Sequence, residues 1–477
     1  MKLTFWGAAR QVTGSMYVLD VDDYKILIDC GSNLEKRKLT EEPEKPSPYG
    51  IFPFEPTEIN LVILTHAHID HSGMLPNLIR EGYEGQILCT SPTFQLSHLL
   101  LHDAAALNMR KLKRIQGGGG KKSKIPVNLK INTAELYSEK AVDDTIERFV
   151  TIGFNERFKI NKNIFITFNP TGHLLGAANV IFEINDHGTQ KSICFSGDIG
   201  RKNYPLLIDP QPVPKVDYIV CETTYGNRRH KTKISHEDAL AEVIQKTCID
   251  APGRLIIPAF SVGRSQALLF TLNKLYAERN FPKIRVFADS PLAYKSTKVY
   301  ESFIKILNKE AQDFFENNES LFDFENLVYV EDLKQSKLIK NYSEPCIIVS
   351  SSGMVQGGRV EQHIFDNISN PYCTILMIGY ASEGTLGHEL LNGMKVLKTK
   401  SGKELSVQAT IESIDIFSGH GDLDDLTDFV KYQDKDKLKN VFLTHGELQS
   451  MFDFKDHLNK EGYQNVEIPE KGQAFLI

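Results

Sequence analysis

Four side chains of the kind that bind metal ions lie within six residues: His66, His68, Asp70 and His71. Imidazole and carboxylate groups are the ligands that borderline cations such as Zn²⁺ prefer, and they also accept Mn²⁺. His66 and His68 are two residues apart, so both can face one cation from an extended segment. Asp70 and His71 lie past a bend and can face a second. The stretch therefore predicts a metal-binding loop in preference to a solvated His-rich loop or histidines buried in a core.

The elements that must position these ligands are strands. The apolar run at 61–64 predicts a buried strand that leads directly into the loop. Loops at strand ends are where sheet-based enzymes collect functional groups. Further residues of ligand type follow the ends of other predicted strands: Asp29, His173, Asp198, Glu222, His420 and His445. A common rim of ligands is therefore expected.

A shared carboxylate would let this rim hold two cations. Asp198 can bridge them if it uses both of its oxygens. We expect one site to be formed by His66, His68, His173 and Asp198, and the other by Asp70, His71, Asp198 and His420. Two cations about 3.5–4 Å apart leave room for a bridging hydroxide, which is a nucleophile at neutral pH. The ligand count predicts a two-metal hydrolase.

The composition of the chain constrains its class, its compartment and its partners only broadly. With 477 residues, 41% hydrophobic and 24% charged, the chain is an ordinary globular protein of two or three domains. It has neither an apolar run as long as a membrane span nor a signal-peptide pattern. Seven widely spaced cysteines predict small core residues in a reducing compartment, so a cytoplasmic protein is expected. The net charge of −6 neither favours nor excludes a polyanionic partner.

The pattern of elements changes at a Pro-rich connector near 207–217. After it, apolar strands alternate with helical segments, which predicts a parallel-sheet α/β domain. The strands are expected at 218–221, 255–258, 284–288, 346–349 and 374–378, and the helices near 235–248, 262–280, 292–317 and 360–367. Short strands return at 395–399, 404–411 and 440–444, with a helix near 422–434.

The segment 65–71, with Asp29 before it and His173 and Asp198 after it, resembles the metallo-β-lactamase superfamily. That resemblance implies an αβ/βα sandwich, with Asp29 orienting the ligands. Within the superfamily the chain resembles the β-CASP nucleases, the branch of the cleavage-and-polyadenylation endonuclease and its bacterial relatives. The segments that carry this second resemblance are 7–15, 222–227, 258–266, 289–292, 350–354, 379–388, 417–420 and 443–447.

The resemblance implies a division of the chain into three parts. Residues 1–208 are expected to form the first part of the metallo-β-lactamase domain, and residues 209–385 an inserted parallel-sheet α/β (β-CASP) domain. Residues 386–477 are expected to complete the first domain and to carry an RNA-metabolising motif.

It also implies roles for single residues. Asp70 and Glu222 are expected in catalysis, Glu222 as an acid/base group or as the partner of a histidine. His388 is expected to be a general acid or a phosphate contact, although the histidine of the corresponding family motif aligns with Glu389. Phosphate contacts are expected from Arg264, Ser351, Ser352, Gly353 and Arg359, and structural roles from Asp29 and His445.

The function implied is that of a ribonuclease with two Zn²⁺, Mn²⁺ being the alternative, that cleaves single-stranded RNA internally. A 5′-exoribonuclease would share every motif, and the oligomeric state stays open. A hydrolase of thioesters or lactams would not need the inserted domain. A non-enzymatic RNA-binding paralogue would lose ligands that this chain keeps. The basic segment 110–124 is either a solvated linker or an RNA contact, and the linker is favoured.

Overall fold

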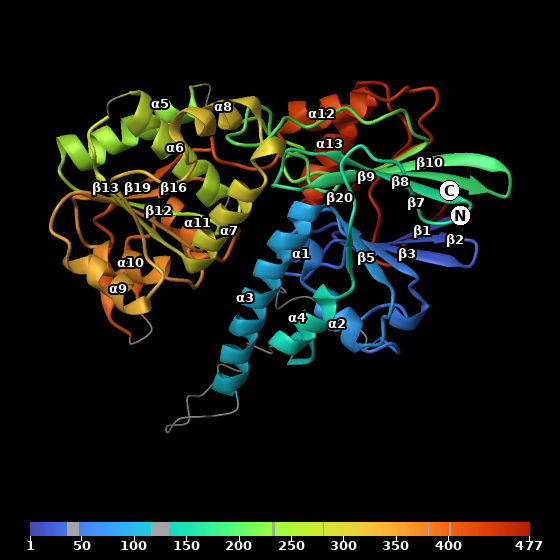
Figure 1. Ribbon diagram of the computed structural model, residues 1–477, viewed down its shortest axis with the longest axis horizontal. Helices are drawn as coiled ribbons and strands as arrows, with labels where there is room; N and C mark the ends of the chain where they lie inside the picture. Colours follow the sequence, from blue (N-terminus) through green and yellow to red (C-terminus); the bar gives the residue numbers. More distant parts are fainter. Residues whose placement is uncertain (36–46, 116–132, 231–233, 280, 380, 400–401) are drawn as a thin grey trace. The chain divides into compact units, whose positions relative to one another are not determined.

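The computed structural model describes residues 1–35, 47–115, 133–230, 234–279, 281–379, 381–399 and 402–477 (Figure 1). The glycine- and lysine-rich part of the basic segment, residues 117–124, lies outside the described residues. The chain forms two compact units. The first contains Met1–Gly200, Pro210–Arg229 and His420–Ile477, and the second contains Arg201–Asp209 and His230–Gly419.

Two seven-stranded sheets form the first unit. In spatial order, the first sheet consists of β22 (Ala474–Leu476), β1 (Lys2–Gly7), β2 (Met16–Val21), β3 (Tyr24–Ile28), β4 (Leu61–Ile63), β5 (Gln86–Cys89) and β6 (Phe149–Thr151). The second consists of β21 (Val466–Glu467), β20 (Asn440–Thr444), β11 (Tyr218–Glu222), β10 (Thr189–Phe195), β9 (Ala178–Asp186), β8 (Ile164–Pro170) and β7 (Phe158–Lys159).

Helices cover the outer faces of both sheets, because each sheet has apolar side chains on its two faces. Between the sheets, Phe5 and Ile26 of the first pack with Phe182 and Phe195 of the second. Figure 1 shows helices of the N-terminal half along one outer face and those of the C-terminal end along the other. These helices are α1 (Ile69–Ser72), α2 (Leu75–Arg80), α3 (Ser91–Ile115), α4 (Glu139–Ile146), α12 (Leu423–Lys431) and α13 (Leu448–Lys460). The layers are those of an αβ/βα sandwich.

The second unit is built on a six-stranded sheet whose neighbouring strands are all parallel. Its order is β14 (Leu327–Tyr329), β13 (Arg285–Asp289), β15 (Cys346–Ser350), β12 (Arg254–Pro258), β16 (Cys373–Met377) and β19 (Thr410–Ser413), with β17 (Val396–Lys398) and β18 (Glu404–Ser406) forming a separate hairpin. Its helices are α5 (His236–Ile244), α6 (Arg264–Glu278), α7 (Pro291–Ser302), α8 (Lys309–Asn318), α9 (Leu333–Leu338), α10 (Val360–Asn367) and α11 (Leu386–Leu391).

Three sequence predictions about elements are wrong. The strand predicted over 404–411 is two strands, β18 and β19, which belong to different sheets. The strand predicted at 218–221 does not begin the sheet of the second unit. As β11, it pairs in parallel with β10 and β20 of the first unit. The helix predicted over 292–317 is two helices, because the chain turns after Ser302 and the side chain of Asn308 caps the start of α8.

The compact units also divide the chain differently from the predicted boundaries at 208 and 385. Residues 386–419 group with the second unit, because β19 extends its sheet and Leu397 packs on its core. The assignment of residues 1–208, 209–385 and 386–477 to three functional parts stays a prediction. All seven cysteines are free and buried, as predicted. In the described part of the chain, no helix is long and apolar enough to cross a membrane.

Candidate metal centre

Asp29, at the end of β3, fixes the loop that follows β4. Its carboxylate accepts hydrogen bonds from Thr65 N at 2.8 Å and from Thr65 Oγ1 at 2.9 Å. Its Oδ2 also lies 2.7 Å from Nδ1 of His71. Because Asp29 holds one ring nitrogen of His71, the other, Nε2, is turned towards the rim of the sheets.

The loop also depends on a close backbone approach at Gly31. A Cβ atom at this position would lie 1.7 Å from the backbone oxygen of Asp70. The neighbouring amides of Ser15 and Cys30 donate to the backbone oxygens of Asp70 and His71, each at 2.8 Å. Only glycine leaves the space that brings Asp70 and His71 to the end of β3.

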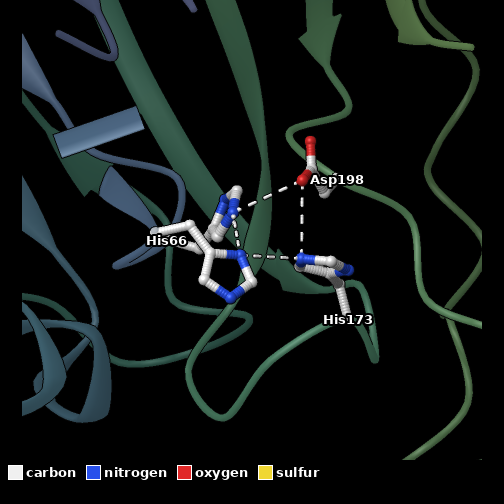
Figure 2. A group of neighbouring side chains, drawn as sticks. His66, His173 and Asp198 are labelled. Atoms are coloured by element: carbon white, nitrogen blue, oxygen red, sulfur yellow. Dashed lines mark hydrogen bonds and ion pairs between the residues drawn. The ribbon is translucent and has the colours of Figure 1, made fainter. Parts of the chain in front are cut away.

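Four side chains converge past the ends of β4, β8 and β10: His66, His68, His173 and Asp198. Their ligand atoms all lie within 4.8 Å of one another. Nδ1 of His68 is 3.1 Å from Nε2 of both His66 and His173. Oδ2 of Asp198 is 3.5 Å from Nε2 of His66 and 3.4 Å from Nε2 of His173 (Figure 2). The sequence predicted this set as one site, and the structure brings it together.

Burial disfavours the protonated form of two imidazoles of this group, His66 and His68. Burial lowers the pKa of His66 well below its usual value, and it lowers the pKa of His68 to about 4. A neutral imidazole offers a lone pair to a cation, so the environment of these two rings favours metal ligation over protonation.

A second group lies beside the first and contains Asp70, His71 and His445. Nε2 of His71 is 3.2 Å from Oδ1 of Asp198. Nε2 of His445 is 3.5 Å from Oδ2 of Asp70 and 3.5 Å from Oδ1 of Asp198. Burial alone would lower the pKa of His445, but the two carboxylates outweigh it and raise that pKa to about 9. The two carboxylates therefore attract positive charge to this position, either as a proton on His445 or as a bound cation.

Asp198 connects the two groups. Its Oδ2 faces His66 and His173, whereas its Oδ1 faces His71 and His445. Asp198 Oδ1 and His445 Nε2 are buried, and neither has a hydrogen-bond partner among the described residues. Buried polar atoms are normally paired, so these two atoms fit the ligation of a cation. The donor set fits the ligation of divalent metal on both sides of Asp198.

His420 lies closer to Glu222, which the resemblance implies as the partner of a histidine, than to Asp198. Its Nδ1 lies 3.2 Å from Oε1 of Glu222 and 4.0 Å from Oδ2 of Asp198. Among the described residues, the two ligand groups include His445 and leave out His420. The ligand role of His420 stays a prediction, but the geometry favours His445 in that place. The signal for His445 in the sequence is its position directly after the strand at 440–444.

Glu222 uses both carboxylate oxygens to hold the loops around Asp198. Oε1 accepts from the amide of Ile199 at 2.8 Å, and Oε2 accepts from the amide of Thr224 at 2.9 Å. Glu222 is 1% exposed. It therefore positions Asp198 through its next neighbour in the chain, in addition to contacting His420.

The remaining predicted site residues belong to the second unit. His388 lies in α11, where its Nδ1 is 3.3 Å from the backbone oxygen of Ala381. The guanidinium of Arg264 lies over the ring of Phe260, 4.7 Å from its centroid. Ser352 exchanges hydrogen bonds with the backbone of Gln356, and a side chain at Gly353 would meet the ring of Phe260.

Arg359 is held by its own unit. It donates to Oδ1 of Asp289 at 2.6 Å and to the backbone oxygens of Val330 and Glu331. A phosphate contact at Arg359 would require some of these bonds to open. The phosphate-binding role of this residue stays a prediction.

Three serine hydroxyls meet at the carboxyl ends of β12, β13 and β15. Ser290 Oγ lies 3.1 Å from Ser261 Oγ and 3.3 Å from Ser351 Oγ. The sequence named only Ser351 of this group as a phosphate contact. Hydroxyl groups at the carboxyl ends of parallel strands are placed where ligands of α/β sheets usually bind.

Three family models match the chain. The model described as the metallo-beta-lactamase superfamily matches residues 9–157, the Beta-Casp domain matches residues 265–390, and the Zn-dependent metallo-hydrolase RNA specificity domain matches residues 404–469.

Similar proteins extend over most of the chain. Ribonuclease TTHA0252 of Thermus thermophilus is 29% identical over 432 residues, covering 90% of this chain and 91% of that protein. The RNase J-like protein of Methanocaldococcus jannaschii is 28% identical and covers 90% and 89%. Transcription termination factor FttA of Methanosarcina mazei is 29% identical, but the match covers only 64% of its length. A solved structure, a protein of unknown function from Enterococcus faecalis V583, matches with a TM-score of 0.54 at 12% identity and covers 100% of this chain and 99% of that one, which shows the fold alone.

Proposed function

Because this chain belongs to the metallo-β-lactamase superfamily and, within it, to the β-CASP RNA nucleases, we propose that it is an endoribonuclease acting on single-stranded RNA. Membership confirms the predicted fold class, a sandwich with an inserted parallel-sheet α/β domain. It also confirms a metal-dependent hydrolase. The proposal adds two statements to this membership: the chain cleaves RNA internally, and its substrate is single-stranded.

The observation that carries the proposal is the pair of ligand groups joined by Asp198. In this proposal His66, His68, His173 and Asp198 hold one cation, and Asp70, His71, His445 and Asp198 hold the other. The imidazole-rich set favours Zn²⁺, with Mn²⁺ as the alternative. Two bound cations supply the positive charge that holds a phosphate and lowers the pKa of coordinated water towards neutrality.

Other residues of the chain would transfer a proton or position the ligands. His420, held at Nδ1 by Glu222, would give a proton from Nε2 to the leaving oxygen. His388, the proton donor that the sequence predicts, remains the alternative. Glu222 and Asp29 act through the residues that they hold, Glu222 through the backbone beside Asp198 and Asp29 through His71.

In this proposal the inserted domain selects the RNA. Its serine hydroxyls at Ser261, Ser290 and Ser351 would donate hydrogen bonds to phosphate oxygens, with Arg264 adding positive charge. The sequence predicts contacts at Ser351 and Arg264, and this assignment adds Ser261 and Ser290 to them.

Cleavage of labelled RNA in linear and circular form tests the internal mode. An endoribonuclease opens the circle, because it needs no free end. Degradation of the linear form alone would contradict the proposal and would indicate a 5′-exoribonuclease. The Asp70→Ala variant serves as the control for metal-dependent chemistry. It should lose cleavage of both forms while its circular dichroism spectrum stays that of the parent chain, and retained activity would overturn the metal assignment.

A further inference from the structure

Apart from the metal centre, three side chains of ligand type meet at the tips of two hairpins: Asp22, Asp186 and His187. Their ligand atoms lie within 4.8 Å of one another. Asp22 begins the two-residue turn between β2 and β3, and His187 begins the two-residue turn between β9 and β10. Because the first hairpin belongs to one sheet of the first unit and the second hairpin to the other, the cluster links the two sheets.

Among the described residues, one carboxylate oxygen of Asp186 accepts hydrogen bonds and the other accepts none. Oδ2 accepts from Lys191 Nζ at 2.6 Å and lies 3.4 Å from the amino group of Met1. Oδ1 is buried, and none of the described residues donates a hydrogen bond to it. The residue is only 7% exposed. A buried carboxylate oxygen is normally paired, so Oδ1 points to a ligand.

Oδ1 of Asp186 faces His187, and His187 in turn contacts Asp22. That oxygen of Asp186 lies 3.9 Å from Nε2 of His187, and the same nitrogen lies 2.8 Å from Oδ1 of Asp22. The side chains of His187 and Asp22 are 81% and 38% exposed, so a cation can reach both from solvent. Two carboxylate oxygens and one imidazole nitrogen form a donor set that suits a zinc-type cation, with water completing its coordination.

We propose that Asp22, Asp186 and His187 form a structural binding site for a zinc-type divalent cation that ties the two hairpins together. The cation would join Oδ1 of Asp186 to both exposed ligands, while Lys191 stays on Oδ2. The Lys191 hydrogen bond lowers the pKa of Asp186, so its carboxylate is ionised and able to ligate at neutral pH.

This site is separate from the candidate metal centre. Asp22 precedes β3 and His187 precedes β10, whereas Asp29 and Asp198 follow those strands. Since β10 has seven residues and a strand rises about 3.3 Å per residue, the two sites are roughly 20 Å apart. Loss of the hairpin site should therefore leave RNA cleavage unchanged, which separates this proposal from the proposed function.

The test is zinc binding by the full chain, measured by equilibrium dialysis with elemental mass spectrometry. The variants are His187→Asn and Asp22→Asn, with His102→Asn as the matched control. His102 also pairs with an aspartate, lying 3.4 Å from Asp143, but among the described residues this pair belongs to no group of three whose ligand atoms lie within 4.8 Å of one another. At micromolar zinc the parent chain and His102→Asn should hold one more zinc per chain than either hairpin variant. Zinc affinity at the site should fall at least about tenfold in both variants.

Thermal unfolding provides a second measurement of zinc binding at the hairpin site. Added zinc should raise the unfolding temperature of the parent chain and of His102→Asn more than that of the hairpin variants. Equal zinc content in the parent chain and in either folded hairpin variant would overturn the proposal and leave the cluster as an ion pair. If His187→Asn does not fold, Asp22→Asn provides the comparison, and its cleavage of RNA confirms that the metal centre is intact.

Discussion

At the residue scale, the carboxylate of Asp29 determines which nitrogen of His71 is offered as a ligand. Oδ2 of Asp29 lies 2.7 Å from Nδ1 of His71, so an ionised Asp29 keeps a proton on Nδ1 and leaves Nε2, which faces Asp198, as the nitrogen that can ligate a cation. An asparagine amide at this position would donate to Nδ1 and move the proton to Nε2. The same contact therefore sets both the orientation and the tautomer of the ligand.

We expect Asp29→Asn to bind metal about 10–100-fold more weakly, and its activity to recover in part at high zinc. Activity measured against free zinc concentration checks this expectation. Asp20→Asn, a carboxylate on β2 that pairs with Lys2 at 3.2 Å, is the control and should behave like the parent chain. A metal dependence of Asp29→Asn that matches the control would rule out the orienting role.

Two histidines of the first unit have neighbours that favour other roles than those the sequence predicts. His445 lies 3.5 Å from both Asp70 and Asp198, whereas His420 is held by Glu222. We expect His445→Ala to lose about one of two bound cations, because it removes a ligand. We expect His420→Ala to keep its metal but to lose about 10²–10⁴-fold in kcat, because it removes a proton donor.

Zinc content and single-turnover cleavage rates of the two variants separate these roles. If His420→Ala loses zinc and His445→Ala retains it, the ligand assignment from the sequence is correct and the geometric one fails. His457→Ala, a substitution on α13, provides a control for the removal of a histidine from the same unit.

At the scale of elements, Asp289 joins one strand to two helices of the second unit. It lies at the end of β13 and is fully buried. Its Oδ2 accepts from Ser336 of α9 at 2.6 Å and lies 2.6 Å from Nε2 of His363 in α10, while Oδ1 accepts from Arg359. Burial alone raises the pKa of Asp289, but the hydrogen bonds from His363, Ser336 and Arg359 outweigh it and lower that pKa below its usual value.

This lowered pKa predicts a pH dependence of stability. The contribution of Asp289 is present above the pKa of an unfolded aspartate, about 3.9, and is lost as the pH falls through the lower folded value. The parent chain should therefore lose stability in its second unit below about pH 4. Asp289→Asn should be less stable at neutral pH by about 3–5 kcal/mol, because Arg359 and His363 lose their buried partner, and its stability should depend less on acid pH.

Urea unfolding at a series of pH values checks both expectations. Asp313→Asn, which removes an exposed carboxylate paired with Lys309, should follow the parent chain. Parallel pH curves for Asp289→Asn and the parent chain would show that this carboxylate does not set the acid stability.

At the scale of the whole molecule, the sequence reveals patterns among neighbouring residues but not the pairing of strands that are far apart in the chain. The loop from His66 to His71 is a local pattern after an apolar strand, and it folds as predicted. The role of His445 depends on β20 lying beside β11, a pairing between segments more than 200 residues apart that no local pattern encodes. For the same reason β11 was predictable as a strand but not as a member of the first unit.

The division of the chain into two units predicts how metal removal acts on the molecule. Every residue of the two ligand groups, from His66 to His445, belongs to the first unit, and the second unit has a separate apolar core. A ligand stabilises only the structure that binds it, by about 2.7 kcal/mol at a hundredfold excess over its dissociation constant. Chelation should therefore destabilise the first unit and leave the second unchanged.

Hydrogen exchange followed by mass spectrometry, with and without a chelator, resolves the two units in the intact chain. Peptides that contain β4, β10 and β20 should exchange faster after zinc removal, because these strands lead into the ligands. Peptides that contain β12 and β15 should keep their protection, because their apolar side chains pack within the second unit. Equal loss of protection in both sets would mean that the units unfold as one, and that the metal centre stabilises the inserted sheet as well as its own.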